Sequence, residues 1–189
     1  MSGDREVAAT RRVVTGHNAN GRSVVLSDGP APNAWASPDV PGLTAVVPWQ
    51  TAAGPVSNEP SDDPAPADRE IGFPEAGGTV LRVATFPPDS VYSDEAIAKL
   101  FATIGSETAQ AAADAQARHF WFHRTDSLDY AVVLDGEIWL LTDEDERRLG
   151  PGDVVIQRGT SHAWSNRSGS ICRMAFVLIG ADPLSGVVQ

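Results

Sequence analysis

The chain is poor in cysteine and in long apolar runs. Cys172 is the single cysteine among 189 residues, so no internal disulfide can form. Its place in an apolar run predicts a packed strand residue and a reducing compartment. No apolar run approaches the roughly 20 residues that span a bilayer, and the first residues lack the apolar segment of a secretory signal. We therefore expect a cytoplasmic protein with no membrane partner.

Positive charge is also scarce. Lys and Arg number 14 against 25 Asp and Glu, which gives a formal net charge of -11. Because a positive field dominates the recognition of polyphosphates, we exclude nucleic acid as a partner. The sequence also lacks a Gly-x-Ser-x-Gly nucleophile elbow, a Gly-rich phosphate loop and a cysteine pair for structural zinc. The partner that we expect is a small molecule.

Length and composition predict one domain with decorations. A chain of 189 residues with 42% hydrophobic content can bury one proper core. Residues 1–78 are expected to form an N-terminal extension, with a β-hairpin over 11–26, a strand over 43–49 and an acidic Pro-rich loop over 51–78. We expect this extension to add strands to a barrel formed by residues 79–182.

The rest of the chain favours an all-β fold with one or two short helices. Residues 79–86 alternate as a strand does, and apolar residues at helical spacing predict a helix that starts at Ser93 and stops at Gly105. The Ala-rich stretch 107–117 predicts a second, weaker helix. Later segments are short, β-rich and separated by turns, which indicates a barrel or a sandwich. These predicted strands span residues 130–134, 137–142, 154–157 and 171–179.

Two stretches of the chain contain three of the four histidines. Residues 119–137 resemble the first cupin motif, H-x-H-x3-4-E-x6-G, and residues 151–166 resemble the second, G-x5-P-x-G-x2-H-x3-N. In the register of that family, His123 takes the first histidine position, Asp129 the glutamate position and His162 the distal histidine position. The chain is similar to the cupin superfamily over about a third of its length.

This resemblance implies a double-stranded β-helix, the jelly-roll barrel of the cupins, and a homodimer. It also implies a metal site made by His123, Asp129 and His162. Fe(II) is the first choice, and Zn, Mn or Ni are possible, because two imidazoles and one carboxylate suit these ions. The second histidine position holds Thr125, whose hydroxyl is a poor ligand. We expect Thr125 and His119 to be additional contacts or to lie just behind the ligands.

Each site residue also has an ordinary structural interpretation. A buried Asp129 could pair with Arg124 or Arg173 instead of binding a metal. Aromatic residues near the motifs could line a small-molecule pocket or simply fill the barrel. The pocket candidates are Trp121, Tyr130, Trp139, Trp164 and Phe176.

The resemblance implies a metal-dependent enzyme that acts on small molecules. Two histidines and one carboxylate favour an Fe(II)-dependent dioxygenase acting on a small aromatic or oxo-acid substrate. A metal-dependent decarboxylase or isomerase is the nearest alternative. The third hypothesis is a non-catalytic barrel that binds a small ligand, and Thr125 at a ligand position is the feature that favours it.

Overall fold

The computed structural model describes residues 9–59, 62–104 and 119–185, and these form mostly β-strands. The strands are β1 (Arg11–His17), β2 (Ser23–Pro30), β3 (Trp35–Ala36), β4 (Thr44–Thr51), β5 (Thr79–Phe86), β6 (Ser127–Asp135), β7 (Ile138–Leu141), β8 (Glu146–Leu149), β9 (Val154–Arg158), β10 (Ala163–Ser165) and β11 (Cys172–Gly180). The helices are η1 (Asp89–Val91), a single 3-10 turn, and α1 (Asp94–Ile104). In these ranges, no helix has the length and apolar character needed to cross a membrane.

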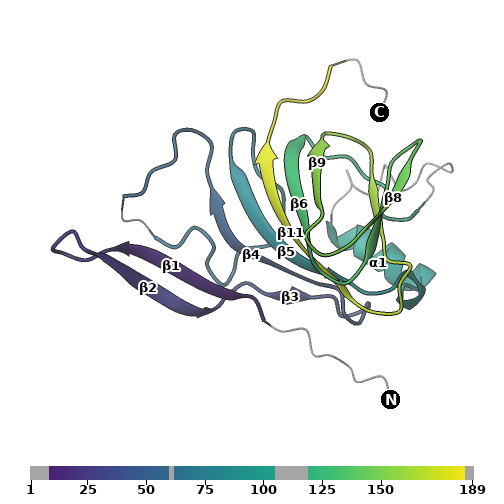
Figure 1. The fold of residues 1–189 in the computed structure, drawn as a ribbon, viewed down its shortest axis with the longest axis horizontal. Coiled ribbons are helices and arrows are strands. Elements are labelled where there is room, and N and C mark those ends of the chain that lie inside the picture. The colour runs from purple at the N-terminus through teal and green to yellow at the C-terminus, as the bar shows by residue number, and fades with distance from the viewer. Residues whose placement is uncertain (1–8, 60–61, 105–118, 186–189) are drawn as a thin grey trace.

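Two antiparallel sheets form the barrel, as Figure 1 shows. The larger sheet has the order β3-β4-β5-β11-β6-β9, and the smaller one has the order β10-β7-β8. One apolar core joins them, because Ile138 of β7 and Trp164 of β10 pack with Met174 of β11 and Val133 of β6. The predicted all-β barrel of the double-stranded β-helix type is confirmed.

Strand alternation decides which side chains of the larger sheet face the barrel interior. In β11 every second residue is buried. Leu178 of this strand lies opposite Val80 of β5 on one side and Asp129 of β6 on the other, and Asp129 lies opposite Gln157 of β9. Directly opposite residues point to the same face of a sheet. This row therefore places one carboxylate and one amide beside apolar side chains on the inner face.

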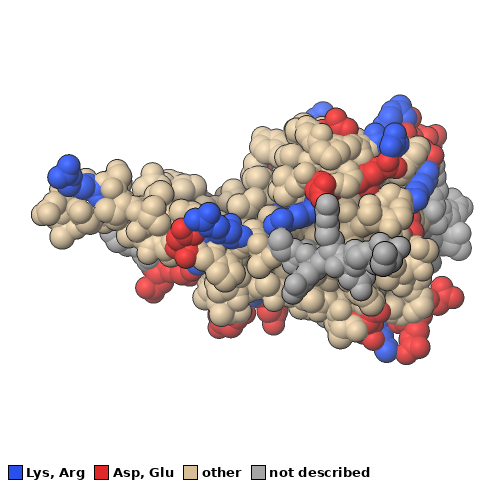
Figure 2. Space-filling view, turned by 60° about the horizontal axis from the view of Figure 1, so that its bottom comes forward, with Lys and Arg blue, Asp and Glu red and all other residues tan. Residues whose placement is uncertain are grey.

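The N-terminal part contributes to the barrel and also extends from it. Strand β4 pairs with β5, and β3 pairs with β4, so residues before 79 form one edge of the larger sheet. Strands β1 and β2 form a separate hairpin, which we call the arm, and it projects from the barrel (Figure 1). Arg12 of the arm forms a 2.5 Å ion pair with Asp63. Figure 2 shows the arm extending beyond the barrel, with acidic and basic side chains interspersed on that face.

Most predicted elements are present, and the exceptions have simple causes. Helix α1 begins after Ser93, whose Oγ accepts a hydrogen bond from the amide of Ala96. Strands β3, β8 and β10 were not predicted from the sequence. Strand β8 reads Glu-Arg-Arg-Leu, and its charged residues lack the apolar alternation that marks a strand. The helix predicted over 107–117 lies outside the described residues.

Cys172 is fully buried in β11. Burial raises the pKa of its thiol to about 12, and the charges of Asp135 and Glu137 act in the same direction. A thiol with this pKa carries almost no thiolate at neutral pH, so Cys172 is a packing residue and not a nucleophile.

Candidate functional site

A cavity of about 590 Å³ lies on the inner face of the larger sheet. Residues 67–73, from the segment predicted as an acidic Pro-rich loop, line one side of it, and the motif residues line another. Its wall is mainly apolar and contains aromatic side chains from several parts of the chain. These are Trp35, Phe73, Phe86, Trp121, Trp164 and Phe176. A cavity of this size and lining suits a small molecule.

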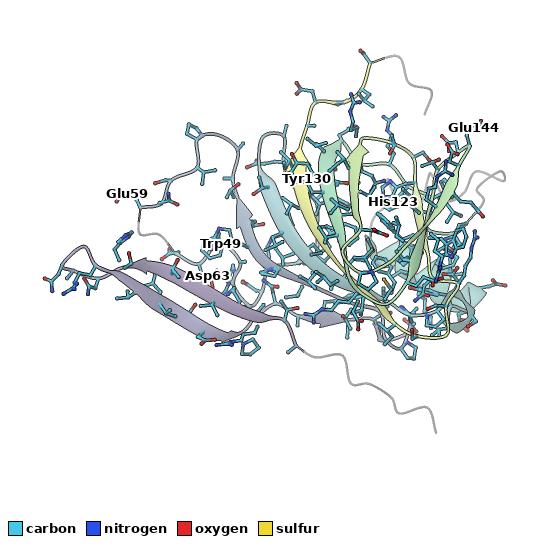
Figure 3. The ribbon with its side chains drawn as sticks, in the orientation of Figure 1. Trp49, Glu59, Asp63, His123, Tyr130 and Glu144 are labelled. Carbon is cyan, nitrogen blue, oxygen red and sulfur yellow. The ribbon has the colours of Figure 1, made fainter. Side chains whose placement is uncertain are left out.

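His123 and His162, which we call the histidine pair, meet in this cavity. Their backbones form an isolated β-bridge, with the amide of each donating to the carbonyl of the other at 3.0 Å. Their ring centroids lie 4.4 Å apart. Figure 3 places His123 among the barrel strands, away from Trp49 and Asp63 beside the arm. The two motifs therefore converge through backbone pairing as well as through their side chains.

Backbone carbonyls fix the proton on each ring of the histidine pair. Nδ1 of His123 lies 2.7 Å from the carbonyl oxygen of Trp121, and Nδ1 of His162 lies 2.9 Å from that of Thr160. A carbonyl can only accept, so each Nδ1 carries the proton and donates it. In a neutral ring, Nε2 then carries the lone pair. This is the usual arrangement behind a histidine that binds a metal.

Both histidines are neutral at physiological pH. Burial, and to a smaller extent the neighbouring His123, lower the pKa of His162 to about 3. Burial also lowers the pKa of His123, and the charge of Arg82 acts in the same direction. Because no proton occupies Nε2, the lone pair of each ring is available to a ligand.

Arg82, Asp129 and Gln157, which we call the polar cluster, also line the cavity. Arg82 donates through Nη2 to the carbonyl of Gly72, and its guanidinium lies over the ring of Phe73, 5.0 Å from the centroid. Within the described ranges, three enclosed atoms of the cluster have no hydrogen-bond partner: Nε of Arg82, Oδ1 of Asp129 and Nε2 of Gln157. Such atoms are costly to bury, so they are candidates for contact with a ligand or with water.

Arg82 and Asp129 compensate each other electrostatically. Burial lowers the pKa of Arg82 to about 10, and the charge of Asp129 opposes that shift. Burial raises the pKa of Asp129, against the opposing effects of the Ser127 hydroxyl and of Arg82. Arg82 is therefore cationic at neutral pH, and Asp129 is the acidic residue whose charge acts on it.

Arg82 and Gln157 were not predicted as site residues from the sequence, although the strand pattern contained a signal for Arg82. In the alternating strand 79–86, Arg82 shares its face with Val80 and Ala84, so a cation stands among residues that are buried. The two partners suggested for Asp129 lie elsewhere. Arg124 lies 3.9 Å from Asp126, and Arg173 donates to the hydroxyl of Thr10.

Thr125 and His119 have different surroundings. Thr125 lines the cavity, and its hydroxyl lies 2.9 Å from that of Ser127. His119, which was expected as an additional contact or just behind the ligands, does not line the cavity. Its Nε2 lies 3.1 Å from Oδ2 of Asp89, and its ring stacks on Phe120. The reason is local, because residues 119–122 form a turn closed by a hydrogen bond from the Phe122 amide to the His119 carbonyl.

Three of the five predicted aromatic residues line the cavity, namely Trp121, Trp164 and Phe176. Tyr130 and Trp139 do not, and this is a correction. Tyr130 follows the inward-facing Asp129, so strand alternation turns it outward, where it is 40% exposed. Trp139 lies 4.6 Å below the guanidinium of Arg167 and away from the cavity.

The donor set partly suits a divalent metal. The histidine pair offers two neutral imidazoles with the proton on the outer nitrogen. In the part of the chain that the structure describes, Oδ1 of Asp129 is buried without a hydrogen-bond partner, and the charge of Arg82 acts on this carboxyl group. Among the residues that the structure describes, no three His, Cys, Asp or Glu side chains are grouped closely enough to hold one ion. Two imidazoles thus converge, and a metal site that they form with Asp129 stays a prediction.

Comparisons with known sequences identify relatives along nearly the whole chain. The chain is 32% identical to "Phomopsin biosynthesis cluster protein C'" of Diaporthe leptostromiformis over 186 residues, which cover 95% of this chain and 82% of that protein. It is 30% identical to "Cupin-domain-containing oxidoreductase fogC" of Aspergillus ruber over 176 residues, which cover 90% of this chain and 72% of that protein. No protein-family profile matches the chain.

Solved structures give more distant similarities. The cupin domain of Schizosaccharomyces pombe Cnp3 is 12% identical, with a TM-score of 0.44, and the match covers 92% of this chain and 89% of that one. A Cupin 2 conserved barrel domain protein of Salinispora arenicola is 16% identical, with a TM-score of 0.38, and the match covers 74% and 76% of the two chains.

Proposed function

Because the chain belongs to the cupin superfamily, we propose that it is a cupin-type oxidoreductase that acts on a small aromatic or oxo-acid substrate. The name of the Aspergillus ruber relative supports the reaction class, and "biosynthesis cluster" in the name of the Diaporthe relative supports a small-molecule substrate. The observation that carries the proposal is the histidine pair, whose two proton-free nitrogens belong to side chains of one aromatic cavity.

The lowered pKa values favour a ligand role for the histidine pair over a proton-transfer role. A general base works best when its pKa lies near the working pH, and a histidine with a pKa of about 3 is a weak base at pH 7. The same shift removes competition between protons and a metal for Nε2. We therefore propose one divalent metal, with Fe(II) as first choice, held by His123 and His162 and by Asp129 as third ligand.

The protein would contribute ligands, orientation and a dry cavity. A bound metal would supply Lewis-acid or oxygen-activating chemistry. The aromatic wall would hold the apolar body of the substrate and exclude water, and the carbonyls of Trp121 and Thr160 would keep both imidazoles in one orientation. With only two ligands grouped in the described residues, a non-catalytic barrel that binds a small ligand is the second candidate.

Elemental analysis and oxygen uptake test this proposal together. Protein purified without chelators should contain close to one equivalent of metal, and Fe(II)-loaded protein should consume oxygen with a member of a panel of aromatic and oxo-acid compounds. His123→Gln and His162→Gln should each lower metal content and turnover by about a hundredfold, because each removes an imidazole. Tyr130→Phe, on the outer face, is the matched control and should change neither quantity.

The outcomes separate the two candidates. A folded barrel without metal, which binds compounds from the panel but does not consume oxygen when loaded with Fe(II), would favour the binding protein. Metal content and turnover that survive both histidine substitutions would exclude the histidine pair as the reaction centre.

A further inference from the structure

The polar cluster suggests which ligands the cavity accepts. Asp129 and Gln157 lie directly opposite each other on β6 and β9, so their side chains stand side by side on the inner face. Both are 4% exposed. In the described ranges, neither the acceptor Oδ1 of Asp129 nor the donor Nε2 of Gln157 has a hydrogen-bond partner. An adjacent donor and acceptor are complementary to a carbonyl that stands next to an N–H or O–H group.

Arg82 adds a second donor to this arrangement. In the part of the chain that the structure describes, its Nε is enclosed and has no hydrogen-bond partner. Its Nη2 donates to the Gly72 carbonyl, and the guanidinium plane lies over the ring of Phe73. The guanidinium therefore has a fixed position, and one of its N–H groups is available. A carbonyl oxygen has two lone pairs and can accept from both Arg82 and Gln157.

The charged residues that line the cavity indicate whether it favours an anionic or an uncharged ligand. Within the polar cluster the charges of Arg82 and Asp129 act on each other, so the cation of Arg82 is not without a counter-charge. Elsewhere on the cavity wall, Arg69 is accompanied by the exposed Asp68 and Glu70, so the lining has two cations and three carboxylates. An anion would lose its hydration and meet no excess of positive charge. The charges therefore disfavour the oxo-acid half of the proposed substrate range.

We propose that Arg82, Asp129 and Gln157 form a specificity subsite for an uncharged aromatic ligand that carries a carbonyl group with an adjacent N–H or O–H donor. Arg82 and Gln157 donate to the carbonyl oxygen, Asp129 accepts from the adjacent donor, and the aromatic wall holds the ring. This inference rests on the proposed function for the identity of the cavity, and it narrows the substrate class. It requires neither a metal nor turnover, and it describes the metal-free cavity, in which Oδ1 of Asp129 is not a metal ligand.

Three probes of nearly equal shape test the subsite. Benzamide has the carbonyl and the N–H, acetophenone has the carbonyl alone, and benzoate has two oxygens and a negative charge. Binding is measured by calorimetry and by quenching of tryptophan fluorescence, with EDTA present so that no metal at the histidine pair contributes. Benzamide should bind about tenfold more tightly than either of the other probes, which corresponds to one well-formed hydrogen bond or one avoided charge penalty.

Two substitutions should each reduce this preference, one by weakening benzamide binding and the other by tightening benzoate binding. Gln157→Met removes the donor with little change in volume, and it should weaken benzamide binding about tenfold. Asp129→Asn removes the counter-charge of Arg82, and it should tighten benzoate binding about tenfold or more, because the guanidinium is then unmatched. A gain of affinity cannot result from misfolding, so this variant keeps the test decisive if Gln157→Met is unstable.

Benzoate binding that equals or exceeds benzamide binding in the parent protein would overturn the inference, and so would the lack of saturable benzamide binding at millimolar concentrations. An unchanged benzoate affinity in Asp129→Asn would also contradict it. A protein that shows the benzamide preference but no metal and no oxygen uptake would support the subsite while refuting the proposed reaction. The two proposals can thus fail separately.

Discussion

The histidine pair and the polar cluster lie on the wall of one cavity, but their hydrogen bonding differs. In the histidine pair each ring is anchored to a backbone carbonyl, and the two backbones are bonded to each other. In the polar cluster each of the three side chains retains an enclosed atom without a partner in the described residues. Without a ligand, the hydrogen bonding of the histidine pair is satisfied except at the two Nε2 atoms. The polar cluster needs a ligand or water to satisfy its three remaining atoms. This difference is what we expect between a proposed metal site and a proposed recognition subsite.

The largest effect that we expect from a substitution comes from separating Arg82 from Asp129. Arg82→Met should lower the free energy of unfolding by about 3 kcal/mol, since it leaves a buried carboxylate without its counter-charge. Combining it with Asp129→Leu should restore most of that loss, because the uncompensated charge is then removed. Urea unfolding of the two single variants and the double variant measures the coupling. Additive losses would show that the two side chains do not act as a pair.

His162 of the histidine pair should make the free energy of unfolding depend on pH. The pKa of His162 is about 3 in the folded protein against 6.5 in the unfolded chain, so only the unfolded chain takes up the proton between these values. Stability should therefore be constant above pH 6.5 and fall as the pH drops towards 3, by at most about 1.4 kcal/mol per pH unit for this group. His162→Gln should make the curve flatter. An unchanged slope in that variant would assign the acid sensitivity to other groups.

Thr125→His tests whether the cavity can be given a third imidazole. Thr125 lines the cavity with both members of the histidine pair, and imidazole is a far better ligand than a hydroxyl. The substitution should raise Co(II) affinity about tenfold or more, as followed by the absorption spectrum of the bound ion. Thr125→Val is the control, because it removes the hydroxyl without adding a ligand. Equal affinities in both variants would mean that position 125 does not reach the ion.

The smallest effect is expected outside the cavity. Tyr130 lies between two inward-facing residues of β6 and is 40% exposed. Tyr130→Ser should change the free energy of unfolding by less than about 0.5 kcal/mol, as is usual for exposed positions. It should also leave probe binding unchanged. A loss of benzamide affinity in this variant would contradict the assignment of inner and outer faces on β6.

Local pattern was sufficient for much of the fold. Strand alternation predicted β5 over its full length, and helical spacing with a capping serine predicted where α1 starts. Strand β8 was missed because its charged residues hide the apolar alternation, and β10 was missed because three residues are too few to show a period. The aromatic candidates Tyr130 and Trp139 were misplaced because the strand register was not known. A shift by one residue turns a side chain to the other face.

The sequence by itself determined the family, the barrel class and the two motif histidines, since these depend on residue types at short, fixed spacings. Only the tertiary structure decided which other side chains line the same cavity. Arg82 comes 47 residues before Asp129 in the chain, and Gln157 follows it by 28, yet β5, β11, β6 and β9 place all three on one sheet face. The pairing of distant strands sets which charges and hydrogen-bonding groups meet, and no local pattern contains that information. The likeness to a family thus identified the histidine pair, and the sheet register identified the subsite.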